Sequence, residues 1–263
     1  MLSTKVNEKS TEKLRSVQWL IIILLTAVAV FLIMGESALA KGWKKKAEEL
    51  EPVNVFIEWN STEEDQGIQF FWDSDGFTRM MVFNESGKKV LDIETKKSVR
   101  DQGLTEVAIE SVEPEGSEQT LDDFFERFPE GTYEFWGRSI EGNWLYGEAD
   151  FTHDLLEPVV FTDTSLPNIS WTAPSQLLSG EPSEVVGYEM VVELVVMENG
   201  DERVFKETTT LPGDATSYLV SATFLDLINS FDPEDIVVLK IEILADEESG
   251  NRTITETPAM VMP

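Results

Sequence analysis

The only histidine in the chain, His153, has the side chain best suited to catalytic chemistry. A Ser-His-Asp hydrolase needs a histidine that is held by a carboxylate and touches a hydroxyl, and Asp150 and Asp154 are carboxylates near His153. The chain contains no G-x-S-x-G nucleophile motif. Its 50 acidic residues bring some carboxylates together whatever the function, so a glycosidase pair is not specifically indicated. We predict that the protein is not an enzyme, and a hydrolase using carboxylates or His153 ranks third among our hypotheses.

Oxygen-rich loops that contain glycine are the second kind of candidate site. One loop carries Glu63 and Asp65, and another carries Asp73 and Asp75. Such carboxylates are the ligands that Ca²⁺ prefers, although neither loop matches the EF-hand pattern. The residues between the loops are predicted to form one strand, which separates the loops by roughly 20 Å at ~3.3 Å per residue. We name these four residues as calcium candidates that do not form one pooled site, with ordinary solvated turns as the alternative. No other cofactor is predicted.

The third kind of candidate is aromatic and lies in a predicted hairpin over residues 132–152. A two-residue turn would place Tyr133, Phe135, Trp144 and Tyr146 on one face and Trp136, Leu145 and Phe151 on the other. Aromatic side chains on a sheet face can stack on sugar rings, so Trp136, Trp144 and Tyr146 are candidates for glycan binding. The alternative is that a neighbouring helix covers the second face.

The elements that carry these residues are mostly short segments of alternating polarity, which predict antiparallel strands. In the first half they are 53–59, 68–72, 77–83, 89–94, 104–112, 132–139 and 143–152. One helix, 121–128, is predicted from a capping box formed by Thr120 and Asp123 and from phenylalanines at helical spacing. We therefore predict a β-rich domain over residues 53–156.

A second set of segments follows the junction at Glu157-Pro158. They are 159–162, 168–172, 185–197, 202–211, 217–225, 236–245 and 252–260, and their number and spacing favour a β-sandwich over residues 157–263. Trp171 after Asn168-Ile-Ser, Gly187-Tyr188, the alternating run 239–245 and Gly250-Asn251 resemble a fibronectin type III domain. Leu239 stands where that family usually has a tyrosine. The resemblance implies a spacer or binding module and no enzymatic activity. The predicted fold class is thus all-β: an antiparallel β-domain with one short helix, then a fibronectin type III-like sandwich.

The N-terminal residues predict export. A basic leader, an apolar run over residues 19–34 and Ala38-Leu-Ala40 have the layout of a secretory signal peptide over residues 1–40. The alternative is an uncleaved anchor in the inner membrane. Residues 41–52 are charged and are predicted to be a spacer. Either way the protein is predicted to be periplasmic or extracellular, and the absence of cysteine together with this leader indicates a bacterial exported protein.

The formal net charge of −30 limits the partners. A strongly negative surface repels phosphate backbones and anionic lipid, so we predict no nucleic acid, and contact with a membrane only through an uncleaved N-terminal segment. A protein or glycan partner stays open. Our first hypothesis is a non-enzymatic interaction or structural module of the bacterial envelope or exterior. The second is a glycan-binding accessory protein with an aromatic platform and a calcium-stabilised loop.

Overall fold

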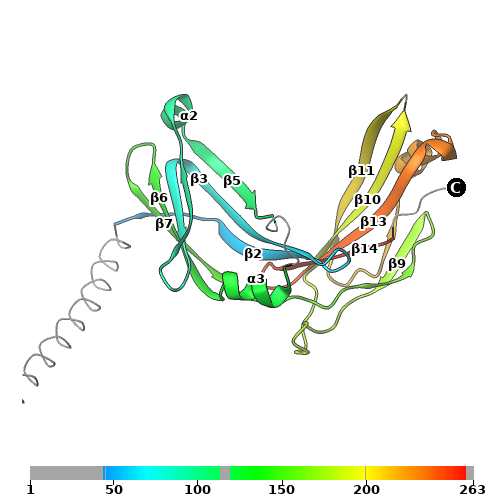
Figure 1. Cartoon of the computed structure of the whole chain (residues 1–263), viewed down its shortest axis with the longest axis horizontal. Coiled ribbons are helices and arrows are strands. Elements are labelled where there is room, and N and C mark those ends of the chain that lie inside the picture. Colours follow the sequence, from blue (N-terminus) through cyan, green and yellow to red (C-terminus); the bar gives the residue numbers. More distant parts are fainter. Residues whose placement is uncertain (1–43, 45, 113–118, 199, 259–263) are drawn as a thin grey trace, which may run out of the picture. The chain divides into compact units, whose positions relative to one another are not determined.

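The computed structural model describes residues 44, 46–112, 119–198 and 200–258 (Figure 1). By their contacts, the described residues from Glu49 onward form one compact unit. Within the described ranges, no helix has both the length and the apolar character that a membrane crossing requires. The predicted signal peptide over residues 1–40, with its apolar run 19–34, lies outside the described residues.

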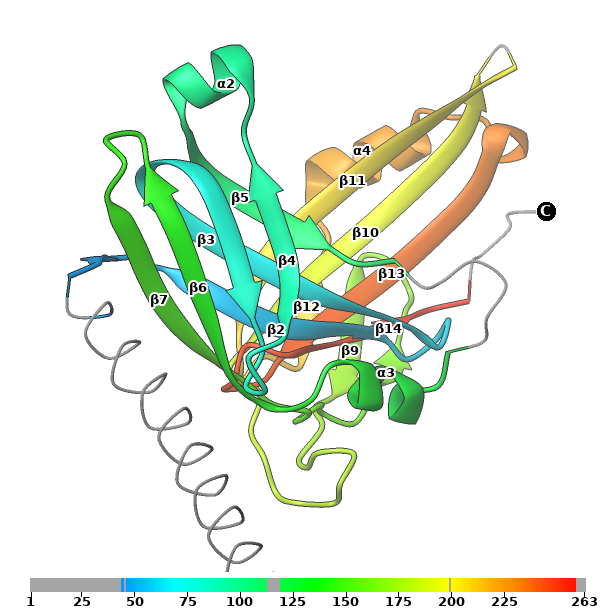
Figure 2. The same cartoon turned by 60° about the vertical axis from the view of Figure 1, so that its left-hand side comes forward.

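The first half of the compact unit is built around the long strand β3 (Asp65–Phe83). Residues 65–77 of β3 pair with β2 (Val53–Asn60) and β5 (Leu104–Glu110), and residues 77–83 pair with β4 (Lys89–Glu94) and β6 (Gly131–Ser139). Figure 2 shows β4, β3, β6 and β7 (Trp144–Phe151) side by side. A short strand, β1 (Glu48–Glu49), precedes β2.

The prediction of two strands separated by an acidic loop at Asp73 to Gly76 is wrong. These residues lie within β3, where the register shifts between Asp73 and Phe77 on the β5 side and between Phe77 and Arg79 on the β6 side. Such irregularities bend a strand without ending it, and glycine often marks them. Gly76 has a φ of 138°, a conformation that L side chains rarely adopt.

The core of this half lies on one face of the β6–β7 hairpin and against β2 and β3. Its fully buried side chains include Trp72, Tyr133, Phe135 and Phe151. The predicted helix forms as α3 (Leu121–Arg127), with both hydrogen bonds of the Thr120 capping box present and Phe124 1% exposed in the core. A second short helix, α2 (Lys97–Gln102), connects β4 to β5 and was not predicted, since it has no buried residue and so no apolar stripe.

The second half is a β-sandwich. A three-stranded sheet of β8 (Val160–Asp163), β9 (Asn168–Thr172) and β12 (Ser217–Leu219) packs against β14 (Arg252–Glu256), β13 (Ile236–Asp246), β10 (Gly187–Glu198) and β11 (Asp201–Pro212). Trp171 and Tyr188 meet edge to face in its core, with ring centroids 5.4 Å apart. The all-β class and the fibronectin type III-like sandwich are confirmed.

The predicted strand 217–225 is wrong beyond Leu219. The chain enters helix α4 (Ala222–Asn229), whose first turn is capped by Ser221, because the Ser221 hydroxyl accepts the backbone N–H of Phe224. Phe224 and Ile228 then lie one helical turn apart in the sandwich core. A 3₁₀ turn, η1 (Pro233–Asp235), leads into β13.

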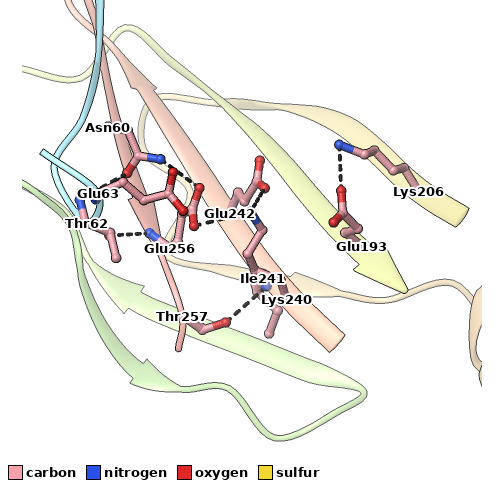
Figure 3. A network of polar contacts seen from close by, with 10 residues as sticks. All are labelled: Asn60, Thr62, Glu63, Glu193, Lys206, Lys240, Ile241, Glu242, Glu256 and Thr257. Atoms are coloured by element: carbon pink, nitrogen blue, oxygen red, sulfur yellow. Dashed lines mark hydrogen bonds and ion pairs between the residues drawn. The ribbon is translucent and has the colours of Figure 1, made fainter. Parts of the chain in front are cut away.

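The two halves share one hydrogen-bonded sheet, which the sequence did not suggest. Strand β2 of the first half pairs in parallel with β14, the last strand of the sandwich, so the path runs β7-β6-β3-β2-β14-β13-β10-β11. Figure 3 shows polar contacts beside this seam. The Asn60 amide donates to Glu256 at 2.7 Å, the Glu256 backbone N–H donates to Thr62 at 2.9 Å, and Lys240 lies between Glu256 at 3.2 Å and Glu242 at 2.7 Å.

Asn251, which is 1% exposed, joins three segments at this seam. Its side-chain oxygen accepts the backbone N–H of Ile57 in β2 at 2.7 Å. Its amide nitrogen donates to the backbone carbonyls of Thr152 and Asp154, each at 3.0 Å. Nearby, the Thr253 hydroxyl donates to the Leu156 carbonyl at 2.9 Å. Leu155 packs in the first core and Leu156 in the second, so these bonds hold the point where the chain passes from one to the other.

Replacing Asn251 with alanine should lower the free energy of unfolding by about 2 to 3 kcal/mol, because the buried N–H of Ile57 and the two carbonyls lose their partner. Urea unfolding followed by tryptophan fluorescence measures this. The matched control is Asn54→Ala, an exposed asparagine on β2, which should change stability by no more than about 0.5 kcal/mol. Equal stabilities for the two variants would contradict the role given to Asn251.

A row of carboxylates surrounds one guanidinium across the same seam. Arg252 lies 2.8 Å from Asp246 and 3.8 Å from Glu189, and it stands opposite Glu58 in the parallel register. Burial raises the pKa of Glu58, and Glu110, Glu189 and Asp246 raise it further against the opposing effect of Arg252. Burial also raises the pKa of Asp246. Ionised carboxylates are thus destabilising at this position.

Glu58→Gln should stabilise the protein at neutral pH and lose this advantage as the pH falls. A pKa raised in the folded state means that the folded form binds the proton more tightly than the unfolded form. In the wild-type protein, the stability that protonated Glu58 contributes is present below the unfolded pKa and is lost as the pH rises through the folded pKa. Glutamine cannot ionise, so the variant does not suffer this loss. Unfolding midpoints of both proteins between about pH 4 and pH 8 measure the difference. A gain from Glu58→Gln that does not change with pH would contradict this account.

Candidate functional site

The turn of the β6–β7 hairpin decides which aromatic side chains lie together. The backbone N–H of Ser139 donates to the Asn143 carbonyl at 3.0 Å, and the N–H of Gly142 donates to the Ser139 carbonyl at 3.1 Å. Ile140, Glu141 and Gly142 therefore form a three-residue loop, and Gly142 has a φ of 86°.

The register that follows pairs Trp136 with Tyr146 and Arg138 with Trp144. Because cross-strand partners share a face, the predicted division of the aromatic residues between the two faces is wrong. It assumed a two-residue turn, and a shift of one residue moves a side chain to the opposite face.

All three glycan-binding candidates lie on the outer face of the hairpin and are half-buried. The ring centroids of Trp136 and Trp144 are 6.1 Å apart, and those of Trp136 and Tyr146 are 4.5 Å apart. The guanidinium carbon of Arg138 lies 3.7 Å from the ring centroid of Trp144. The indole N–H of Trp136 donates to Glu134 at 3.0 Å, and the Tyr146 hydroxyl donates to Glu148. We call Trp136, Arg138, Trp144 and Tyr146 the outer hairpin face.

Sequence reasoning named the aromatic members of this face but missed Arg138. The signal was present, because Arg138 follows Trp136 by two residues and alternate residues of a strand share a face. Its position over Trp144 depends on the turn, which the sequence left open.

The inner face of the hairpin is core, and one side chain of α3 belongs to the same core cluster. Phe124 packs in the core, while the ring of Phe125 stacks on that of His153 with centroids 4.0 Å apart. The Nε2 atom of His153 lies 2.8 Å from the carbonyl oxygen of Phe128, and its backbone N–H donates to Glu130 at 2.7 Å. A carbonyl only accepts, so Nε2 carries the proton in this contact, which gives His153 a positioning role for the end of α3.

The calcium candidates lie in two separate places. Glu63 is in the turn between β2 and β3, where its N–H donates to Asn60, and Asp65 begins β3. Asp73 and Asp75 lie in the bend of β3, and Asp73 accepts the N–H of Ser74 at 2.7 Å. In the part of the chain that the structure describes, no three acidic or histidine side chains are grouped as metal ligands. Calcium at these positions stays a prediction.

A shallow hollow of about 540 Å³ adjoins the outer hairpin face. It is lined by Thr78 from the bend of β3, by Arg100 and Asp101 from α2, and by Arg138, Ser139, Ile140 and Gly142 from the hairpin. A second hollow of about 510 Å³, on the sandwich, has no aromatic or basic side chain in its lining, which is residues 173–175, 183–186, 213 and 214.

Two glycines fix the hairpin tip beside the first hollow. A Cβ atom on Gly76 or on Gly103 would lie 2.6 Å from Cδ1 of Ile140. Ile140 therefore rests against the bend of β3 and the end of α2 together, so a Cβ atom at either glycine would require the Ile140 side chain to shift.

No protein-family model matches the chain, and no curated protein matches it. Among solved structures, the chain is similar to the FN1–FN3 domains of chicken CNTN1, with a TM-score of 0.32 and 10% identity over 81% of this chain and 62% of that one. It is also similar to Tp47, the 47-kilodalton lipoprotein of Treponema pallidum, with a TM-score of 0.32 and 11% identity over 79% and 50%.

A tetra-tandem repeat from the extending region of a large adhesion protein gives a TM-score of 0.23 and 13% identity over 80% of this chain and 49% of that one. The chain thus spans between 49% and 62% of the lengths of these three structures. At such low TM-scores and identities, these likenesses carry no argument about ligand or activity.

Gly103→Ala should destabilise the protein by about 1 kcal/mol more than Gly87→Ala. Both glycines have positive φ, 81° and 73°, but a Cβ on Gly87 meets nothing within 4 Å. Gly87→Ala therefore measures the backbone strain alone, about 1 kcal/mol, whereas Gly103→Ala adds the overlap with Ile140. Chemical unfolding of both variants, and of Ile140→Ala with and without Gly103→Ala, measures the coupling. Additive effects of Gly103→Ala and Ile140→Ala would mean that this contact does not fix the tip.

Proposed function

We propose that the protein is an exported, non-enzymatic interaction module that binds a glycan on the outer hairpin face. The observation that carries the proposal is the gathering of Trp136, Trp144 and Tyr146 on one half-buried face, while the opposite face of the hairpin belongs to the core. Core aromatic side chains are explained by packing. The three aromatic rings on the outer face of the hairpin lie outside this core, so core packing does not explain them.

The polar groups among the rings favour a sugar over an apolar protein surface. Glu134, Arg138 and Glu148 are bonded to or stacked on the three aromatic side chains. The centres of protein–protein interfaces are enriched in Trp, Tyr and Arg but depleted of Glu, so the two carboxylates are what distinguish this face from such a centre. A sugar presents an apolar ring face and a rim of hydroxyl groups, which suits aromatic rings flanked by carboxylates and a guanidinium.

The chemistry of the other candidates supports a non-enzymatic role. The side-chain contacts of His153 in the described residues are with Phe125, Phe151 and the Phe128 carbonyl, and none of these is a nucleophile. Export is proposed from the predicted signal peptide over residues 1–40.

Alanine substitution of Trp144 should weaken glycan binding at least about tenfold, because loss of an anchoring tryptophan commonly costs more than 1 kcal/mol of binding free energy. Affinity electrophoresis measures this, with the full-length protein in gels that contain β-glucan, xylan, alginate or polygalacturonate. We expect retardation by at least one of these polymers and its loss in Trp136→Ala and Trp144→Ala.

The matched control is Phe205→Ala. Phe205 lies on β11 with the guanidinium of Arg203 5.0 Å from its ring centroid, so it reproduces the arginine–aromatic pair away from the hairpin. Its replacement should leave the retardation unchanged. If no polymer retards the wild-type protein, or if the two tryptophan variants are retarded as strongly as the wild type, the proposed function is wrong.

A further inference from the structure

The hollow beside the outer hairpin face differs in charge from the rest of the protein. Its lining contains two basic residues and one acidic residue, in a chain with a formal net charge of −30. Two arginines from separate elements, Arg100 of α2 and Arg138 of β6, line the same hollow. Local positive charge on so acidic a protein is a feature that solubility does not explain.

We propose that the ligand of this site is a glycan that carries carboxylate groups, and that one carboxylate binds in the hollow between Arg100 and Arg138. The inference rests on the proposed function, because Arg138 belongs to both parts of the site. Its guanidinium lies over Trp144 on the outer hairpin face and also lines the hollow. A sugar bound at the outer hairpin face therefore has a cation nearby, and a volume of about 540 Å³ accommodates a sugar residue.

The two arginines are suited to a carboxylate for different reasons. Arg138 is held in place, since it stacks on Trp144 and its Nη1 donates to the Gly142 carbonyl at 2.6 Å. A guanidinium has five N–H donors in a planar fork that matches a carboxylate. Arg100 lies 3.6 Å from Glu94 with both side chains about half exposed, and such a pair contributes little and rearranges readily. Asp101, the acidic residue in the lining, is suited to accept sugar hydroxyl groups.

The overall negative charge opposes an acidic ligand, but the carboxylates that lie far from the hollow contribute little to this opposition. The Debye length is about 8 Å at physiological ionic strength, so distant carboxylates are largely screened. A charge-assisted contact with two arginines acts over about 3 Å and is screened much less. The long-range repulsion is weaker for a polymer with widely spaced carboxylates than for nucleic acid, whose phosphates lie closer together.

The experiment compares polygalacturonate with its carboxyl-reduced form, which has the same backbone without the charge. Isothermal titration with the full-length protein should give at least about fivefold tighter binding to polygalacturonate. Arg100→Gln should remove most of this preference, because it removes one of the two positive charges that line the hollow. Arg203→Gln, on β11, is the control for loss of one positive charge and should keep the preference.

Each outcome distinguishes this inference from the proposed function. Equal binding of the two polymers, or a preference that Arg100→Gln leaves intact, overturns the acidic ligand while the aromatic site stands. Tighter binding of the reduced polymer also overturns it. If the wild-type protein binds neither polymer and no neutral glycan retards it, both proposals are wrong. Thermal unfolding of Arg100→Gln within about 1 °C of the wild type confirms that the exposed substitution leaves the fold intact.

Discussion

The bend in strand β3 is the constraint on which both halves of the structure depend. Before the bend, β3 pairs with β2, which continues the sheet into β14 and the sandwich. After the bend, β3 pairs with β6, which carries Trp136 and Arg138. The bend itself brings Gly76 against Ile140 at the hairpin tip. One strand therefore connects the seam of the molecule to its candidate binding site, and the register shifts at residues 73–79 set the direction of each part.

The seam and the hairpin differ in the charges that surround their arginines. At the seam, Arg252 is surrounded by carboxylates, so burial there favours the protonated form of Glu58. At the hairpin, Arg100 and Arg138 line one hollow with a single acidic residue. The seam buries the amide of Asn251 and provides hydrogen-bond partners for both its oxygen and its nitrogen, which is the usual requirement for a buried amide. The hairpin keeps its polar groups half-exposed, where a ligand can reach them.

The sequence predicted most of the elements and little of their connections. Alternation of polarity found the strands, and the Thr120 capping box found α3, because both signals are local. The alternation of polarity gave a wrong prediction at Asp73 to Gly76. Polar residues and a glycine there have the composition of a loop, although β3 continues through them and pairs with β5 and β6. The alternation also failed at Ser217 to Leu225, where Ser221 begins a helix. The parallel pairing of β2 with β14 and the role of Asn251 join residues 194 positions apart, and no local pattern reports such contacts.

The most direct test of the account is a ¹⁹F NMR titration of the full-length protein labelled with 5-fluorotryptophan. Its seven tryptophans give separate resonances that single substitutions assign. With a short galacturonate oligosaccharide, or with its carboxyl-reduced form, we predict that the resonances of Trp136 and Trp144 shift. Those of Trp72 and Trp171, which are 0% and 3% exposed in the two cores, should stay in place. Shifts confined to tryptophans outside the hairpin, or no shift with either sugar, would contradict the account.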